Sequence, residues 1–253
     1  MPPVTGVHVR STADWPMPEG MMMQLGGDEL RPAKCPFYVL EHPEALVLVD
    51  TGLSHELVAD PEGYGAPGLA ELVPAIELDA TTTEHLADLG YEPADVDHVV
   101  CTHLHMDHVG RLDAFPDATT HVHVDELRYA WWPDPAQAGF YVDRDLEPLR
   151  DPDRTVREVV GRTDLLGDGS IELLPTPGHT PGHLSVLVDR GDDRVLLAAD
   201  AANLRAGYEA ELVAPFAWSA AESVESIRRL KAETREGDTV VVHHDPEDLA
   251  RLE

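Results

Sequence analysis

The chain has 253 residues, of which 43% are hydrophobic and 26% charged, the composition of a folded globular domain and not of a disordered chain. Asp and Glu total 48 against 18 Lys and Arg, so the net charge is −30 at pH 7. This imbalance argues against a nucleic-acid partner, and no apolar run approaches the roughly 20 residues that span a bilayer, so we also expect no membrane partner. Because salt screens repulsion between acidic groups, the composition indicates a halophilic protein.

Cysteine usage and the beginning of the chain bear on the cellular compartment. Cys35 and Cys101 are the only cysteines, and they form no CxxC pair. A disulfide framework and a cysteine-rich zinc site are therefore excluded. The first residues lack a basic region followed by an apolar stretch. We expect a cytoplasmic protein.

The elements of the first half alternate between strands and short helices. In chain order, strands are predicted at Val4 to Arg10, Phe37 to Leu40, Leu46 to Val49, Val96 to Cys101 and 118 to 124, and helices at Thr82 to Leu89 and Asp125 to Trp132. The stretch from 133 to 153 contains four prolines and has no clear period. We predict that it is a surface excursion over a site.

The second half repeats the pattern. Strands are predicted at Ile171 to Leu174, Leu184 to Val188, Val195 to Ala199 and Thr239 to Val242, and Ser219 with Glu222 forms a capping box for a helix ending near Thr234. Alternation of strands and helices favours an α/β or α+β class. No linker or repeat divides the chain, so we expect a single domain, 1–253.

The strongest local signal is the heptapeptide Thr102-His103-Leu104-His105-Met106-Asp107-His108. In an extended segment, residues 103, 105 and 107 point to one side, while His108 can turn toward a neighbouring ion. Imidazole and carboxylate groups bind zinc, iron, manganese and related ions. A surface histidine cluster is the alternative interpretation.

Further candidate ligands stand at predicted strand ends. His179 lies in Thr176-Pro177-Gly178-His179-Thr180-Pro181-Gly182-His183, whose Pro-Gly pairs predict tight turns, and His244 ends the last strand. Asp200 directly follows five apolar residues, where an unpaired buried carboxylate would be costly without a cation. These positions indicate a metal centre assembled from several loops.

In these motifs and their order, the sequence resembles the metallo-β-lactamase superfamily of binuclear metallohydrolases. The resemblance runs from Asp50-Thr51-Gly52 to His244-Asp245 and implies an α+β fold, the αβ/βα four-layer sandwich of two facing sheets with helices outside. It implies two divalent metal ions, with Zn²⁺ as the first choice and Fe, Mn or Co as alternatives. The implied ligands are His103, His105 and His179 for the first ion, Asp107, His108 and His244 for the second, and Asp200 as the bridge.

The expected chemistry is hydrolysis, because two ions about 3.5 to 4 Å apart can lower the pKa of a shared water toward about 7 and generate hydroxide that attacks a carbonyl. Asp107 is also a candidate proton donor to the leaving group. Asp50 is the first candidate for orienting a ligand, and His183 a weaker one. His121 and His123 share a strand face, and we interpret them as surface or core histidines.

Within the superfamily, the chain resembles the N-acyl homoserine lactonase branch most. Cys35 to Glu41, Leu48 to Gly52 and the aromatic residues of the loop 130 to 147 carry this likeness. That branch commonly has a tyrosine three residues after the bridging aspartate, where this chain has Asn203. Asn203 could donate a hydrogen bond to an oxyanion or be a turn residue, and Tyr208 could replace the missing phenol. A second departure is His243, where a glycine is usual.

We therefore predict a lactone or ester hydrolase with a small-molecule substrate, and leave a homodimer open. Met21 to Met23, Phe140, Tyr141 and Trp218 could line an acyl-chain site or belong to the core. Two alternatives remain: a glyoxalase II-like thioesterase and a non-catalytic metal-binding protein of the same fold. The thioesterase would need arginines for the carboxylates of its substrate, since the chain has only two lysines.

Overall fold

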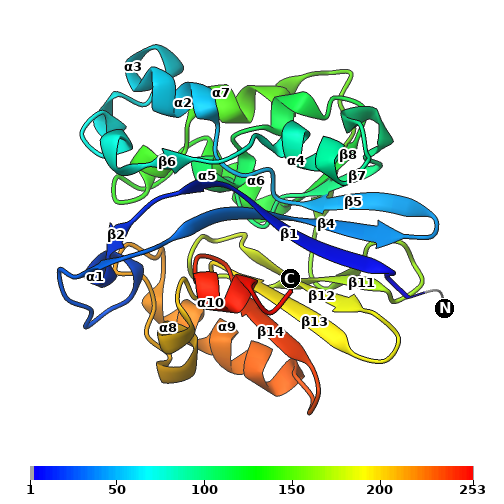
Figure 1. Cartoon of the computed structure of the whole chain (residues 1–253). Coiled ribbons are helices and arrows are strands. Elements are labelled where there is room, and N and C mark those ends of the chain that lie inside the picture. The colour runs from blue at the N-terminus through cyan, green and yellow to red at the C-terminus, as the bar shows by residue number, and fades with distance from the viewer. Residues whose placement is uncertain (1–2, 253) are drawn as a thin grey trace.

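The computed structural model describes residues 3–252 as two β-sheets that face each other, with helices on both outer faces (Figure 1). This architecture confirms the predicted α+β four-layer sandwich. In Figure 1, α2, α3, α4 and α7 lie above the larger sheet, and α8 and α9 lie below the smaller one. None of the helices in residues 3–252 combines the length and apolar character required to span a bilayer.

The larger sheet has seven strands in the order β6-β1-β4-β5-β7-β8-β9. Its strands are β1 (Gly6–Asp14), β4 (Lys34–His42), β5 (Ala45–Val49), β6 (Glu77–Leu78), β7 (His98–Val100), β8 (Thr119–His123) and β9 (Val156–Val159). β1, β4 and β5 pair antiparallel, whereas β5, β7, β8 and β9 are parallel. Parallel strands require crossover connections, and these place helices on the outer face of the sheet.

The smaller sheet has five strands in the order β10-β11-β12-β13-β14. They are β10 (Thr163–Asp164), β11 (Ile171–Pro175), β12 (Leu184–Asp189), β13 (Arg194–Ala199) and β14 (Thr239–Val242). Only β13 and β14 are parallel, and α9 connects them on the outer face. A separate hairpin is formed by β2 (Met17–Pro18) and β3 (Leu30–Arg31).

The helices are short except for α9. They are α1 (Glu19–Met22), α2 (His55–Ala59), α3 (Pro61–Tyr64), α4 (Thr82–Asp88), α5 (Met106–Val109), α6 (Val124–Ala130), α7 (Asp143–Leu146), α8 (Arg205–Ala210), α9 (Ala220–Glu233) and α10 (Pro246–Leu249). Six 3₁₀ turns add η1 (Pro67–Leu69), η2 (Val73–Ala75), η3 (Pro93–Asp95), η4 (Leu112–Ala114), η5 (Ala138–Phe140) and η6 (Glu147–Arg150). Of the capping box predicted for α9, the hydrogen bond from the Glu222 backbone N–H to the Ser219 side chain is present.

The core lies between the sheets and is built from alternate strand residues. Val47, Val49 and Leu40 from the larger sheet pack in one cluster with Val186 and Leu197 from the smaller sheet. A second cluster fills the space between the larger sheet and its helices, and a third lies under α9. These layers hold the strands rigidly, so the loops at the strand ends have a fixed support.

Among the predicted segments that differ from the structure, two show why. β1 extends to Asp14, beyond the expected end at Arg10, because β4 pairs with it along nearly its whole length. The stretch from 133 to 153 is not wholly on the surface: it contains η5, α7 and η6 and buries Gln137, Asp145 and Leu146. Its lack of period reflects turns of three or four residues, which are too short to show one.

Candidate metal centre

The candidate ligands lie in the segments that follow the ends of strands from both sheets. β7 leads into the loop with His103 and His105, β11 leads to His179, β13 to Asp200 and β14 to His244. β13 and β14 are parallel, so Asp200 and His244 leave the smaller sheet at the same edge. The fold thus brings together histidines that are far apart in the sequence.

Two of the strand ends have strained backbone. Asp50 has φ of 63° and Ala199, which precedes Asp200, has φ of 47°, in the left-handed region that residues with a Cβ rarely adopt. Such strain costs on the order of 1–3 kcal/mol per residue and persists only where the surroundings enforce it. At both positions the chain turns sharply, and the carboxylates of Asp50 and Asp200 meet His108.

The first cluster consists of His103, His105 and His179, all buried, whose ligand atoms lie within 4.8 Å of one another. His105 Nδ1 is 3.1 Å from His179 Nε2, and His103 Nε2 has no hydrogen-bond partner among residues 3–252. Burial lowers the pKa of His179 to about 4 and holds the pKa values of His103 and His105 well below their usual range. All three imidazoles are therefore neutral, which is the form that binds a metal.

The second cluster consists of Asp107, His108 and His244. Asp107 Oδ2 lies 3.8 Å from Nε2 of His108 and also 3.8 Å from Nε2 of His244. Asp200 stands between the clusters: its Oδ1 is 3.5 Å from His108 Nε2, and its Oδ2 is 3.2 Å from His244 Nε2 and 3.4 Å from His179 Nε2. One carboxylate therefore faces ligands of both clusters.

The electrostatics of the centre favour positive charge. Burial disfavours the charged form of His108, but the carboxylates of Asp107, Asp200 and Asp50 outweigh burial and raise its pKa to about 10. Burial likewise opposes ionisation of Asp200, yet the histidines around it hold its pKa well below the usual value. The residues thus create a buried environment that stabilises a cation.

The donor set fits a pair of divalent ions. Nε2 of His103, Nε2 of His108 and Oδ1 of Asp200 are buried and have no hydrogen-bond partner within the described part of the chain. Buried polar atoms are rarely left without a partner unless a ligand or ion satisfies them. Nitrogen and carboxylate donors suit zinc and several other divalent metals.

The predicted supporting residues differ in how they contact the ligands. Asp50 Oδ2 lies 2.9 Å from His108 Nδ1, and the Asp50 carboxylate also accepts hydrogen bonds from the backbone N–H and hydroxyl of Thr102. His183 Nδ1 lies 2.8 Å from Thr176 Oγ1, and the His183 ring centroid is 5.5 Å from that of His103. Asp50 thus contacts a ligand directly, and His183 packs behind one.

His121 and His123 lie apart from the clusters. His121 Nε2 is 3.2 Å from His98 Nδ1, and His123 Nδ1 accepts the backbone N–H of Asp125 at the start of α6. Both are largely buried, in keeping with their interpretation as structural residues. His243, in contrast, stacks on His108 with ring centroids 4.3 Å apart.

A cavity of about 230 Å³ opens beside the clusters. His105, Asp107, His179, Asp200 and His244 form its polar end together with Asn203, and the remaining lining is mostly apolar: Trp15, Pro16, Met17, Pro18, Met21, Leu30, Leu69, Leu72, Ala75, Met106, Phe140 and Phe216, with Glu71. No Lys or Arg is among these described lining residues. Such a cavity suits a ligand with a polar head and an apolar tail.

The structure separates the residues that were candidates for contacting substrate. Asn203 lines the cavity, whereas Tyr208 belongs to the apolar cluster under α9 and is not among the lining residues. Met21 and Phe140 also line the cavity, but Met22 is a core residue and Trp218 lies in a separate surface groove. The proximity of Tyr208 in sequence was misleading because α8 turns its ring toward the outer layer.

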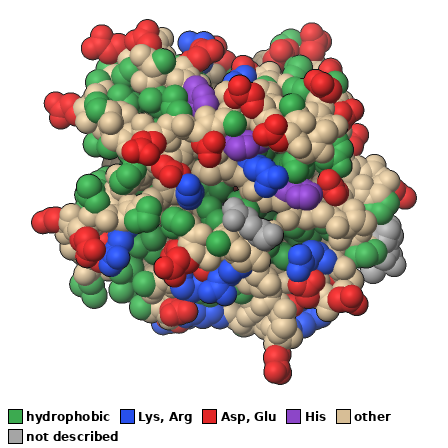
Figure 2. Space-filling view, in the orientation of Figure 1, with side chains coloured by type: hydrophobic (Ala, Val, Ile, Leu, Met, Phe, Trp, Pro, Cys, Tyr) green, Lys and Arg blue, Asp and Glu red, His purple; other side chains and the backbone are tan. Residues whose placement is uncertain are grey.

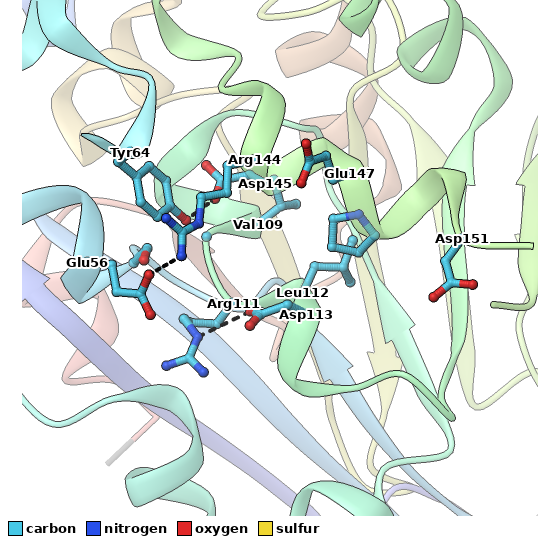
Figure 3. Close-up of a pocket in the computed structure, with 13 residues that line it drawn as sticks. Glu56, Tyr64, Val109, Arg111, Leu112, Asp113, Arg144, Asp145, Glu147 and Asp151 are labelled. Atoms are coloured by element: carbon cyan, nitrogen blue, oxygen red, sulfur yellow. Dashed lines mark hydrogen bonds and ion pairs between the residues drawn. The ribbon is translucent and has the colours of Figure 1, made fainter. Parts of the chain in front are cut away.

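A second cavity, of about 340 Å³, is lined by residues of α2, α5 and α7 and of the segments after α5 and α7 (Figure 3). Two of its carboxylates are paired with arginines, Glu56 with Arg144 and Asp113 with Arg111, and Asp145 accepts a hydrogen bond from the Tyr64 hydroxyl. The metal-ligand candidates are absent from its lining residues. We therefore place the site in the first cavity.

The sequence interpretation missed three residues that surround the clusters. Thr102 donates a hydrogen bond to Asp50. Glu126 accepts hydrogen bonds from backbone N–H groups of the two loops that carry the first cluster. Gln137 donates a hydrogen bond to the carbonyl oxygen of His179 over 2.6 Å. The sequence held only a weak signal for Glu126. It lies four residues before Ala130, so the two residues share one face of α6, and this face is buried. Gln137 had no periodic signal, because it lies in the irregular stretch.

Comparison with known proteins agrees with this geometry. Residues 30–242 match the family model of the metallo-β-lactamase superfamily. The N-acyl homoserine lactonase AttM of Rhizobium radiobacter is 34% identical over 224 residues, covering 86% of this chain and 84% of the relative. An N-acyl homoserine lactonase of Bacillus cereus is 31% identical over 199 residues, covering 77% and 74%.

A solved structure is also similar over nearly the whole chain. It is an N-acyl homoserine lactone hydrolase with the product N-hexanoyl-L-homoserine bound at the catalytic metal centre, with a TM-score of 0.81, 25% identity and coverage of 98% of this chain and 96% of that chain. The fold, the ligand clusters and these likenesses agree: the chain belongs to the metallo-β-lactamase superfamily.

Proposed function

We propose that the protein is a binuclear metal-dependent hydrolase that opens the lactone ring of N-acyl homoserine lactones or closely related esters. The observation that carries this proposal is the cavity, whose polar end is formed by the ligand clusters and whose remaining wall is apolar and free of Lys and Arg in the described lining. The named lactonase relatives support the same substrate class.

The two clusters would each hold one divalent ion, with Zn²⁺ as our first choice. His103, His105 and His179 would bind the first ion, Asp107, His108 and His244 the second, and Asp200 both. When bound, the ions supply a nucleophilic hydroxide near neutral pH and polarise the substrate carbonyl. The similarity to a product-bound lactone hydrolase supports an active centre of this kind.

The chain's own residues would position the substrate and transfer the proton. Asp107 lines the cavity and would take the proton of the hydroxyl group that adds to the carbonyl and pass it to the oxygen that leaves when the ring opens. Asn203 also lines the cavity, where its amide would donate a hydrogen bond to the oxygen on which negative charge develops. The apolar wall would hold the acyl chain and exclude water from it.

The cavity favours a lactone over a glutathione thioester. Recognition of the two carboxylates of glutathione requires cations, and arginine is the residue best suited to bind them. None of the described residues lining the cavity is Arg or Lys. The glyoxalase II-like alternative therefore lacks a recognition site, and the non-catalytic alternative does not explain a cavity that ends on Asp107 and Asp200.

A substrate panel tests this function. Acid release is followed with a pH indicator for acyl homoserine lactones of several chain lengths, for simple esters and for S-lactoylglutathione. We expect the lactones to have the highest kcat/KM, and Asp107→Asn to abolish turnover while Asp113→Asn, an exposed carboxylate outside the cavity, retains it. Preferential cleavage of the thioester would overturn the proposal.

The surface and the cysteines support a salt-rich, reducing compartment. Figure 2 shows Asp and Glu side chains over all parts of the visible face, in keeping with the net charge of −30. Cys35 and Cys101 are both buried and unpaired. We infer a halophilic cytoplasmic enzyme, whose melting temperature rises with potassium chloride concentration; equal stability in dilute buffer and molar salt would contradict the halophilic assignment.

A further inference from the structure

Glu126 is a fully buried carboxylate outside the ligand clusters. It lies in α6, directly after β8, and its relative exposure is 0%. A buried carboxylate is costly unless hydrogen-bond donors surround it.

The donors to Glu126 come from both loops that carry the first cluster. Its Oε1 accepts the backbone N–H of Leu104, between His103 and His105, over 3.1 Å. Its Oε2 accepts the backbone N–H of Gly182, in the loop that begins near His179, also over 3.1 Å. One carboxylate therefore connects the two loops, with one oxygen assigned to each.

The third donor links Glu126 to a ligand ring. The Tyr141 hydroxyl donates to Glu126 Oε1 over 2.9 Å, and the Tyr141 ring packs edge-on against His105, with centroids 4.8 Å apart. Through Tyr141, Glu126 also restrains the rotation of the His105 ring. Through this contact, the stretch that begins at Pro133 lies against the first cluster.

The close approach of the second loop depends on a glycine. A Cβ on Gly182 would lie 2.2 Å from the backbone nitrogen of Glu126 and 2.5 Å from its Cβ. Real Cβ atoms do not approach so closely, so only glycine brings this backbone N–H within reach of the carboxylate. The Pro-Gly-His sequence after Thr180 thus has a packing role as well as a turn role.

We propose that Glu126 is a positioning residue that fixes the spacing between the 103–105 loop and the 179–183 loop, and thereby sets the affinity of the first metal site. The inference rests on the proposed metal centre. Asp50 is its counterpart for the second site, because Asp50 contacts His108 directly and Glu126 contacts none of the second-site ligands in the described hydrogen bonds. Glu126 thus supports the first site, whereas Asp50 supports the second site directly and reaches the first through Thr102, whose hydroxyl lies 3.2 Å from His103 Nδ1.

Glu126→Gln tests this division. The amide has one oxygen and one NH₂ group, so in either orientation the NH₂ faces a backbone N–H of Leu104 or Gly182 and one loop is released. Outer contacts of this kind typically change metal affinity by about 10- to 100-fold. We therefore expect the first of the two sites to weaken by that factor, with the second site unchanged.

The measurement is a Co²⁺ titration of metal-free protein, followed by the visible absorption bands of the bound ion and by competition with a chelator. Wild type, Glu126→Gln, Asp50→Asn and the double variant are compared, and Glu225→Gln, an exposed glutamate on α9, is the matched control. We expect Glu126→Gln to weaken the first-site step alone, Asp50→Asn to weaken the second-site step most, and the double variant to weaken both. Unchanged affinity in Glu126→Gln, or weakening of both steps equally, would overturn the inference.

Tyr141→Phe is a second variant that tests the role of Glu126 if Glu126→Gln does not fold. This variant removes the hydroxyl and keeps the ring on His105 and both backbone hydrogen bonds. We expect a smaller loss of affinity at the same site and altered cobalt bands, and no change in either would overturn the inference. Two-site metal binding without lactone opening would instead contradict the proposed function, because the titration does not depend on turnover.

Discussion

Asp50 Oδ2 lies 2.9 Å from His108 Nδ1, and both side chains are fully buried. The carboxylate holds the imidazole with its other nitrogen directed toward Asp107 and Asp200. A carboxylate behind a metal-bound histidine fixes the ring orientation and raises its basicity as a ligand. The strained backbone of Asp50, with φ of 63°, is therefore explained by its role at the site.

Asp50→Asn is expected to reduce activity through metal loss. In one orientation the amide NH₂ group would face His108, and in the other it would face the backbone N–H of Thr102. Either orientation disturbs the contacts that hold the His108 ring in place. We expect about 10- to 100-fold weaker binding of one ion, with activity restored by added metal. Full activity at the wild-type metal concentration would contradict the assigned contact.

Asn203→Ala tests the cavity amide. Loss of a hydrogen-bond donor to a developing oxyanion typically lowers kcat by about 10²- to 10³-fold. The matched variant is Tyr208→Phe, which removes a buried hydroxyl that has no partner among residues 3–252 and lies outside the cavity. Steady-state kinetics on one lactone should show a large loss of kcat in Asn203→Ala and no loss in Tyr208→Phe. The opposite result would assign the hydrogen bond to the substrate oxygen to Tyr208.

Leu72→Arg tests the apolar wall. Each buried methylene contributes ~0.8 kcal/mol, about a fourfold gain in kcat/KM for each carbon that enters the cavity. We expect this gain with chain length to flatten in the variant, while the shortest lactone is hydrolysed at a similar rate. Leu78→Arg is the control, because Leu72 and Leu78 are equally exposed at 43% and only Leu72 lines the cavity. Equal effects of both variants would contradict the assigned wall.

Asp145 makes stability depend on pH. Burial, helped by the carboxylate of Asp113, raises the pKa of Asp145 to about 7 from its ordinary 3.8. Because the folded state holds the proton more tightly than the unfolded state, this contribution is fully present below pH 3.8 and is lost as pH rises through 7. The loss is at most about 4 kcal/mol, taking 1.36 kcal/mol per pKa unit.

Asp145→Asn should therefore raise the melting temperature, and more at pH 8 than at pH 5. Asparagine can still accept the hydrogen bond of the Tyr64 hydroxyl. Asp192→Asn, an exposed site with the same charge change, should have equal effects at both pH values. Calorimetry of metal-free protein measures both, and a stabilisation by Asp145→Asn that does not grow with pH would contradict the assigned pKa.

The sequence indicated the candidate ligands better than the residues that support them. His103, His105 and Asp107 were recognisable because metal ligands follow a local spacing, and Asp200 and His244 because they end apolar strands. Glu126 and Gln137 were not recognisable, since their partners are backbone groups of distant loops. Asn203 and Tyr208 could be separated only by the direction of a short helix, which sequence spacing does not determine.

The four-layer fold could also be predicted from local patterns in the sequence. Strands such as Val195 to Ala199 have continuous apolar runs that mark a buried position, and the order of motifs then indicated the superfamily. The segment from 55 to 78, with α2, α3 and two 3₁₀ turns, was not predicted. Its helices and 3₁₀ turns are three to five residues long, and tertiary packing against Trp15 and Met106 stabilises them more than helix propensity does.

Metal stoichiometry measured beside lactone turnover tests the central claim most directly. Protein purified in high salt is stripped of metal, reloaded with Zn²⁺ and analysed for bound metal and for acid release from an acyl homoserine lactone. We expect two ions per chain and turnover that appears only as the second ion binds. A single ion at full activity, or two ions without hydrolysis of any lactone, would contradict a binuclear lactone hydrolase.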